Sequence, residues 1–267
     1  MATQAPAGTS TIQGPLWSER VDDWARIQEP LMRPAFEAAL EALALTPGVR
    51  LLDVGCGSGL ALRLAADRGA TVTGLDASAG MLEHARRRVP GAPLVQGELE
   101  DLPFGDGEFD VVTGFNSFQY AAHPTAALAE AARVLAPGGR VLYLNWAPPE
   151  LCEAAGYLGA IGALMPPPPP GAPGPFALSD QDAITRIFGE AGLTIVARAD
   201  VSVVWGYPDE TTAIEGLMAA GPIVIAINHA GLDATVAATR TFLEPFRGDD
   251  GGYRIMNVFR YAIGKAS

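Results

Sequence analysis

Three glycines within five positions follow an apolar segment and an acid in LLDVGCGSG, residues 51–59. Such a turn between a strand and a helix lets a ligand approach the backbone closely. The dinucleotide-binding pattern has a third glycine three positions after its second, to pack the helix near a pyrophosphate, but Leu60 stands there. Asp53, two residues before the first glycine, would oppose a diphosphate and suit an ammonium group. The loop therefore favours a cationic ligand without phosphates.

Two further acidic stretches extend this site to a nucleoside. Asp76 lies at the end of the second expected strand, in VTGLDAS, about 20 residues after the loop, where an acid can hydrogen-bond both hydroxyls of a ribose. In GELEDLPF, the residues Glu98, Leu99 and Glu100 are placed to meet an adenine through its amino group and its ring face. Together the three stretches predict a ligand in which adenosine is attached to an amino acid.

A layered scaffold has to position these residues. Apolar runs such as VRLLDV, DVVTGF and RVLYLNW do not alternate with polar residues, which is typical of strands buried on both faces of a parallel sheet. We expect strands at 50–54, 71–75, 93–96, 110–114, 139–145, 193–204 and 253–264, and helices at 58–67, 78–88, 124–135 and 180–190. This alternation predicts a doubly wound α/β fold, in which ligands bind at the carboxyl ends of the strands.

The other segments are expected to surround that edge of the sheet. We divide the chain into a mobile tail (1–14), N-terminal cap helices (15–48) and a main domain (49–267) with a lid loop (147–178) and a helical insertion (209–246). The tail lacks the basic start and apolar centre of a signal peptide. The lid loop contains a run of five prolines at 166–170, for which a spacer role is favoured over a partner-binding motif.

Composition argues against several kinds of partner. The chain has 267 residues, of which 49% are hydrophobic and 18% charged, and a formal net charge of −12. This charge repels phosphate backbones and anionic lipids, so we expect no nucleic acid and no membrane partner. The basic triplet Arg86–Arg88 is expected to be a solvated helix face. Two cysteines make no disulfide framework, and no Cys/His cluster has metal-ligand spacing, so we expect a cytoplasmic protein without a metal site.

Four motifs in order resemble those of the class I S-adenosylmethionine-dependent methyltransferases, and most closely the small-molecule group related to quinone-biosynthesis enzymes. LLDVGCGSG is similar to the first motif, VTGLDAS to the ribose-binding acid, QGELEDLPFGDGEFDVV to the adenine segment and fourth strand, and RVLAPGGRVLYLNW to the fifth-strand signature. The resemblance is strong over 49–146, weaker over 15–48 and weak after 146. It implies a Rossmann-like sheet of seven strands, mostly parallel with the last antiparallel, and helical cap elements.

The resemblance also implies which residues would hold S-adenosylmethionine. Around its methionine part the motifs place Asp53, Gly55, Cys56, Gly57 and, through the backbone, Asn116. Around its adenosine they place Asp76 at the ribose and Ala77, Met81, Glu98 and Leu99 at the adenine. Many relatives have an aspartate where this chain has Glu98, and the extra methylene would shift the contact onto water or Glu100.

A sulfonium is already an activated methyl donor, so the enzyme's main task would be to align the acceptor and exclude water. A hydroxyl or protonated amine acceptor would also need a general base, for which His123 and His229 are the candidates because histidine titrates near neutral pH. Trp24, Tyr120 and Trp146 are candidate walls of the acceptor pocket. We expect a small, largely hydrophobic acceptor, with O-methylation ahead of C- or N-methylation.

Other interpretations of the same residues stay open. The positive charge of the cofactor could serve a rearrangement or cyclisation in which no methyl group is transferred. Dinucleotide-dependent oxidoreduction is disfavoured by Leu60 and Asp53. A non-catalytic module would bind the cofactor and form no product. The sequence also leaves open whether the chain forms a homodimer.

Overall fold

The computed structural model of the chain describes residues 8–167 and 174–266. These residues form a seven-stranded sheet in the order β3-β2-β1-β4-β5-β7-β6. The strands are β1 (Arg50–Val54), β2 (Thr71–Asp76), β3 (Leu94–Gln96), β4 (Phe109–Phe115), β5 (Leu135–Trp146), β6 (Leu193–Tyr207) and β7 (Tyr253–Ala266). The first five are parallel, and β7 is antiparallel to both of its neighbours. The predicted fold class is confirmed, including the antiparallel last strand.

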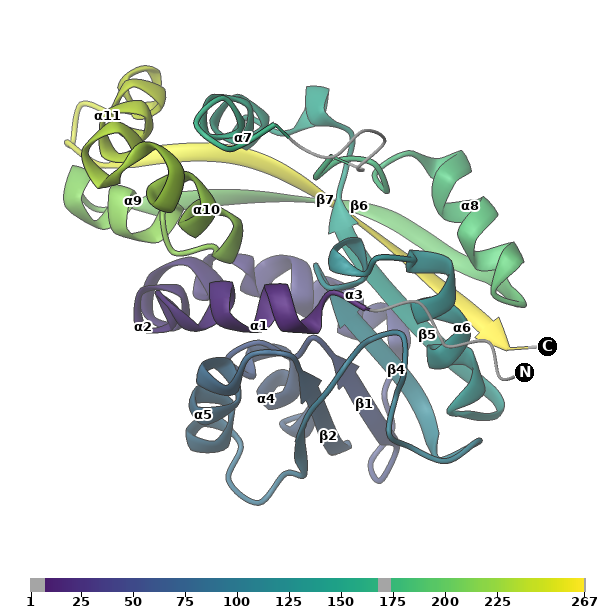
Figure 1. Cartoon of the computed structure of the whole chain (residues 1–267). Helices are drawn as coiled ribbons and strands as arrows, with labels where there is room; N and C mark the ends of the chain where they lie inside the picture. The colour runs from purple at the N-terminus through teal and green to yellow at the C-terminus, as the bar shows by residue number, and fades with distance from the viewer. Residues whose placement is uncertain (1–7, 168–173, 267) are drawn as a thin grey trace.

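The helices lie on both faces of this sheet (Figure 1). They are α1 (Ser10–Ser18), α2 (Val21–Asp23), α3 (Arg33–Leu43), α4 (Leu60–Ala66), α5 (Ala79–Arg88), α6 (Pro124–Arg133), α7 (Ala154–Gly162), α8 (Gln181–Glu190), α9 (Glu210–Leu217), α10 (Gly221–Ala230) and α11 (Leu232–Leu243). Short helical turns are η1 (Trp24–Gln28), η2 (Glu29–Met32), η3 (Phe118–Tyr120), η4 (Pro149–Leu151) and η5 (Glu244–Phe246). The four predicted helices of the main domain are confirmed as α4, α5, α6 and α8.

The apolar strands are explained by burial on both sides. Leu51 and Leu52 are adjacent in β1, yet Leu51 belongs to the hydrophobic cluster that contains α3 and α4, and Leu52 to the cluster that contains α6 and α8. Successive side chains of a strand point to opposite faces, so a strand between two helical layers has to be apolar throughout. The sheet thereby fixes the carboxyl ends of β1, β2 and β4 next to one another.

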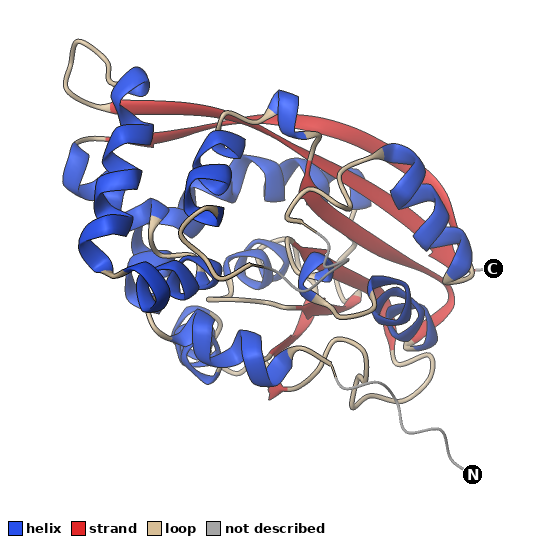
Figure 2. Cartoon of the chain, turned by 45° about the horizontal axis from the view of Figure 1, so that its top comes forward, coloured by secondary structure: helices blue, strands red, loops and turns tan. Residues whose placement is uncertain are grey.

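The last two strands carry the helical insertion. β6 and β7 have 15 and 14 residues, and they extend past the parallel strands to the group α9–α11 at their far end (Figure 1). Figure 2 shows the same group of helices from another side. Among the described residues no single helix is long and apolar enough to cross a bilayer. Taken together, α9 and α10 have the required length and apolar character, but the pair is bent by 98°.

The predicted tail was wrong in part. Residues 1–7 lie outside the described ranges, but α1 begins at Ser10, so 10–14 is helical. Tertiary packing of α1 explains this helix better than the helix propensity of its residues does. A Cβ on Gly14 would lie 2.6 Å from the carbonyl oxygen of Ala77, and a Cβ on Gly221 would lie 2.8 Å from the Trp17 ring. Close contacts to the loop after β2 and to α10 therefore hold α1 in place between α5 and α10 (Figure 1).

The predicted lid loop at 147–178 was also wrong in part. It contains η4 and the nine-residue helix α7. The prolines on either side suggested an extended segment, but the residues AAGYLGAIG between them form a helix that contributes Tyr157 and Ile161 to the core. Most of the five-proline run falls in 168–173, which lies outside the described residues.

Candidate functional site

The glycine-rich loop follows β1, between the ends of β2 and β4. Gly55 and Gly57 have φ angles of 70° and 54°, in the left-handed region that glycine adopts without strain. A Cβ on Gly55 would lie 2.4 Å from the Cβ of Ser117. The glycines therefore let the loop turn sharply and pass directly against the segment that follows β4.

Asp76 ends β2 beside this loop. Its Oδ2 accepts the N–H of Gly57 and its Oδ1 accepts the N–H of Ser78, both at 2.8 Å. Burial raises the pKa of this carboxyl to about 6, although the backbone N–H bonds lower it. Each carboxylate oxygen can accept a second hydrogen bond. Asp76 is thus held rigidly and keeps acceptor capacity for a pair of hydroxyls.

Asp53 is only 1% exposed. The hydroxyl of Thr113 donates to its Oδ1 at 2.7 Å. Burial raises the pKa of Asp53 to about 8; the Thr113 bond lowers it, and the carboxylates of Asp76 and Glu29 raise it further. A carboxyl group in such surroundings gains its charge when a cation approaches. This electrostatic setting fits an ammonium group and opposes a diphosphate.

One cavity of about 570 Å³ joins the loop to the cap helices. All ten predicted cofactor residues line it, namely Asp53, Gly55, Cys56, Gly57, Asp76, Ala77, Met81, Glu98, Leu99 and Asn116. Apolar side chains from the cap, α7 and the turn after it, β6 and α10 line the rest, including Phe36, Ile161, Met165, Trp205 and Ile223. A polar part and an apolar part thus share one space.

The predicted substrate residues Trp24, Tyr120 and Trp146 line the same cavity. Trp17 of α1 packs edge-on against Trp24 and Tyr120, with ring centroids 4.8 and 5.6 Å apart. Trp146 packs against Trp205 at 5.5 Å. Aromatic rings from the cap, from the turn η3 and from β5 and β6 therefore form the wall of the apolar part.

The histidines lie elsewhere. His123 and His229 are exposed, and within the described residues no histidine lines the cavity. The backbone N–H of His123 donates to Glu100, and Nδ1 of His229 lies 3.1 Å from the carbonyl oxygen of Leu164. The structure does not test their predicted role as bases, but it places neither side chain at the cavity. In the described ranges, no group of three or more metal-binding side chains could hold a metal ion.

Glu98 makes a contact that the sequence did not indicate. Its Oε2 accepts the N–H of Ser10, in the first turn of α1, at 2.8 Å, and its Oε1 accepts the N–H of Leu99 at 2.8 Å. The extra methylene relative to aspartate therefore serves a bond to the cap. This carboxylate ties α1 to the predicted adenine segment.

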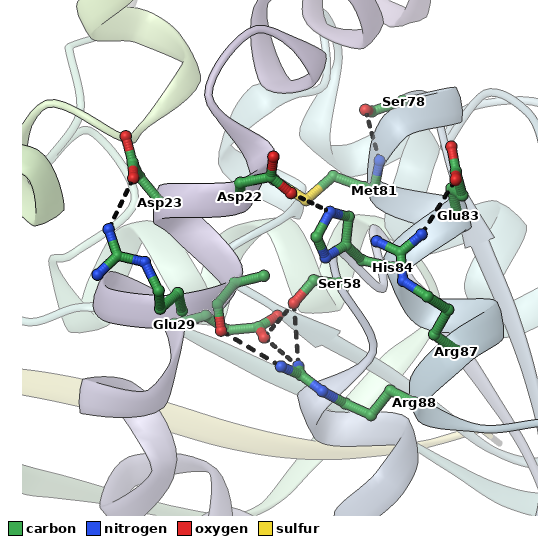
Figure 3. Close-up of polar contacts among 12 residues, drawn as sticks. Asp22, Asp23, Glu29, Ser58, Ser78, Met81, Glu83, His84, Arg87 and Arg88 are labelled. Atoms are coloured by element: carbon green, nitrogen blue, oxygen red, sulfur yellow. Dashed lines mark hydrogen bonds and ion pairs between the residues drawn. The ribbon is translucent and has the colours of Figure 1, made fainter.

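Sequence reasoning also missed Glu29. It is 4% exposed, it lines the cavity, and its Oε2 accepts hydrogen bonds from the hydroxyl of Ser58 and the guanidinium of Arg88 (Figure 3). Arg88 was expected on a solvated helix face, but its side chain is only 25% exposed because it reaches this carboxylate. The sequence signal was weak: a glutamate between Ile27 and Leu31 in an apolar helical pattern.

Several residues that line the cavity carry buried polar atoms without a hydrogen-bond partner in the described ranges. These atoms are Gln13 Oε1, Asn116 Oδ1, Ser117 Oγ, Gln119 Oε1 and Trp205 Nε1. Asn116 also has a φ of 52°, which is uncommon for a residue other than glycine. A buried polar group without a partner costs about 1–3 kcal/mol. The cavity therefore fits a ligand that brings polar groups to several of its walls.

Comparison with known proteins gives a consistent result. Residues 52–143 match the family described as a methyltransferase domain. A demethylmenaquinone methyltransferase of Beutenbergia cavernae is 38% identical over 112 residues, which is 42% of this chain and 47% of that protein. An uncharacterized protein of Mycobacterium tuberculosis is 32% identical over 213 residues, covering 78% of this chain and 75% of that one. The chain spans about half the length of the named methyltransferases that it matches.

The fold has solved counterparts as well. The crystal structure of a putative methyltransferase from Bacillus halodurans superposes with a TM-score of 0.59 at 18% identity, covering 86% of this chain and 97% of that one. At this identity the similarity concerns the fold. The family match, residues 52–143, covers most of the strands and loops that surround the polar part of the cavity, whereas the cap and the apolar part lie mainly outside these residues.

Proposed function

Because the chain belongs to the class I S-adenosylmethionine-dependent methyltransferases related to the quinone-biosynthesis enzymes, we propose that it transfers a methyl group from S-adenosylmethionine to a small, largely hydrophobic acceptor. The observation that carries this proposal is the single cavity, in which the acidic glycine loop and an aromatic, apolar chamber are continuous. Methyl transfer needs the two reactants in line within one water-poor space.

The residues around the loop fit the family's cofactor. Asp53 and Asp76 offer carboxylates to the ammonium group and the ribose. Asn116 and Ser117 line the cavity as well, and in the described part of the chain the side-chain oxygen of each has no hydrogen-bond partner. When bound, S-adenosylmethionine supplies a methyl group on a positively charged sulfur. The task of the chain is then to hold the acceptor against that group and to exclude water.

The chemistry of the chamber favours an acceptor that carries an oxygen. Trp205 is 6% exposed and its indole N–H has no partner in the described part of the chain. Gln28 also lines the cavity, and the hydroxyl of Tyr207 donates to its Oε1 at 2.7 Å, so its amide N–H₂ stays available as a donor. Two donors in an otherwise apolar wall suit a carbonyl, phenol or enol oxygen. For this reason we place O-methylation ahead of C- or N-methylation.

The test is an incubation of the purified protein with methyl-labelled S-adenosylmethionine and a panel of phenolic and enolic apolar compounds, followed by mass spectrometry. We expect the label in the acceptor and one S-adenosylhomocysteine formed per methylated product. Conversion of an acceptor without incorporation of label would replace this proposal with a non-methylating reaction of the same fold. Absence of S-adenosylmethionine binding in calorimetry would refute both.

A further inference from the structure

Glu29 lies outside the sequence motifs, in the turn η2 of the N-terminal cap, yet it reaches the glycine loop. Its Oε2 accepts bonds from Ser58 and Arg88, while its Oε1 has no hydrogen-bond partner among the described residues. A Cβ added to Gly57 would lie 3.4 Å from that Oε1. One oxygen of Glu29 is therefore held by the protein, and the other stands over the loop at the cavity wall.

Three carboxylates thus converge on the loop. Glu29 is close enough to Asp53 and to Asp76 that its charge contributes to raising the pKa of both carboxyls. Among the described residues, Arg88 forms an ion pair with Glu29, and neither Asp53 nor Asp76 forms an ion pair with any of them. Burying several carboxylates near one cation is unfavourable unless a further cation arrives. The cluster therefore has more carboxylates than paired cations, and a cationic ligand would reduce this imbalance.

We propose that Glu29 binds the ammonium group of the cofactor's methionine part through Oε1, so that the N-terminal cap itself supplies a cofactor ligand. This inference rests on the proposed function. Of the two cationic groups in S-adenosylmethionine, only the ammonium has N–H bonds to donate, so it suits a fixed carboxylate oxygen. Ser58 and Arg88 act as positioning residues that fix the orientation of the carboxylate.

A purely structural role makes a different prediction. If Glu29 served only as the buried partner of Arg88, its loss would loosen the loop and weaken every adenosine ligand alike. If it binds the ammonium group, its loss should weaken only those ligands that carry this group. The cofactor product S-adenosylhomocysteine has the ammonium group, whereas 5′-methylthioadenosine has the same nucleoside and sulfur without the amino acid.

The experiment compares these ligands by isothermal titration calorimetry on the full chain and on Glu29→Gln, which keeps the side-chain shape. We expect the affinity for S-adenosylmethionine and S-adenosylhomocysteine to fall about tenfold or more, as for the loss of a charge-assisted hydrogen bond. We expect the affinity for 5′-methylthioadenosine to stay within about twofold. Equal changes for all three ligands, or no change for any, would overturn the inference.

Two further variants distinguish a specific loss of ligand binding from a general loss of folding. Glu29→Gln/Arg88→Gln removes both members of the ion pair, leaves no unpaired charge, and should lose the same preference. Ser58→Ala keeps the carboxylate and removes one of the two groups that hold it, so it should reduce the preference for S-adenosylhomocysteine over 5′-methylthioadenosine less than Glu29→Gln does. Thermal unfolding of each ligand-free variant measures the structural cost separately. If the wild-type chain binds none of the ligands, the proposed function fails with the inference; if it binds them and Glu29→Gln binds them equally well, only the inference fails.

Discussion

The two parts of the cavity are built in different ways. In the polar part, the key contacts join neighbouring motifs: the N–H of Gly57 meets Asp76 across 19 positions of the chain. In the apolar part, they join distant segments: the hydroxyl of Tyr207 meets Gln28 across 179 positions. The polar part depends mainly on the loops at one edge of the sheet, to which the cap adds Glu29 and the contact between Ser10 and Glu98. The apolar part depends on how the cap, α7 and the β6–β7 pair pack together.

This difference separates what the chain binds from what it acts on. A site made of backbone turns and short acidic side chains tolerates few residue types, so its sequence is recognisable. A wall of packed aromatic rings tolerates many combinations of similar volume, so its sequence carries little information on the ligand. Variants that affect one part and not the other are therefore the most direct test of the comparison.

The largest effect is expected from Gly55→Ala. The new Cβ would lie 2.4 Å from the Cβ of Ser117 at a φ of 70°, so the loop has to move. We expect cofactor affinity to fall about a hundredfold or more in calorimetry, because the backbone that surrounds the methionine part is displaced. Gly91→Ala is the matched control: its φ is 85°, but no atom lies within 4 Å of the new Cβ. It should lose some stability and keep cofactor affinity.

The second-largest effect is expected from a change of pH, which should alter stability and cofactor affinity through the polar part alone. Burial raises the pKa of Asp53 to about 8 and that of Asp76 to about 6, above their values in the unfolded chain. The ligand-free protein should therefore lose stability as pH rises from about 4 to 8, because only the unfolded chain ionises freely in that range. The cationic cofactor favours the ionised carboxylates, so its affinity should rise about tenfold or more between pH 6 and 8.

Calorimetry in buffers of different ionisation enthalpy measures the protons released on binding at each pH. Asp53→Asn keeps an oxygen that can accept from Thr113, and it should flatten the pH dependence of affinity above pH 7. An unchanged profile in this variant would assign the titration to another group. Acceptor binding should not share this profile, since the apolar part is lined mostly by groups that do not titrate in the range.

The sequence predicted the fold, and the residues that it proposed for the polar part of the site line one cavity in the structure. Uninterrupted apolar strands and the spacing of Asp53 and Asp76 depend on local rules, and the structure places both side chains at one edge of the sheet. Glu29 could not be recognised, because its role comes from an approach of η2 to the loop after β1 that no local pattern encodes. Likewise α1 is held by the contact of Gly14 with Ala77 and by the contact of Trp17 with Gly221. The helix propensity of the α1 residues alone does not predict such contacts.

A smaller effect is expected in the apolar part from Trp205→Phe. The variant removes the unpartnered N–H and keeps an aromatic ring beside Trp146. With an oxygen-bearing acceptor, we expect KM to rise about threefold to tenfold, as for the loss of one neutral hydrogen bond. An analogue of the acceptor without that oxygen should bind wild type and variant equally. Cofactor affinity should stay within about twofold; a parallel loss of cofactor affinity would contradict the separation of the two parts.

The smallest effect is expected from the histidines, which lie outside both parts. A general base that touches the acceptor contributes about a hundredfold to ten-thousandfold to the rate. His123 and His229 are exposed and do not line the cavity, so His123→Gln and His229→Gln should each leave kcat within about twofold. The measurement is kcat from pH 6 to 9 with the best acceptor of the labelled assay. A hundredfold loss, restored at high pH where the acceptor ionises by itself, would instead establish the histidine as the base and require the segment around it to close over the cavity during the reaction.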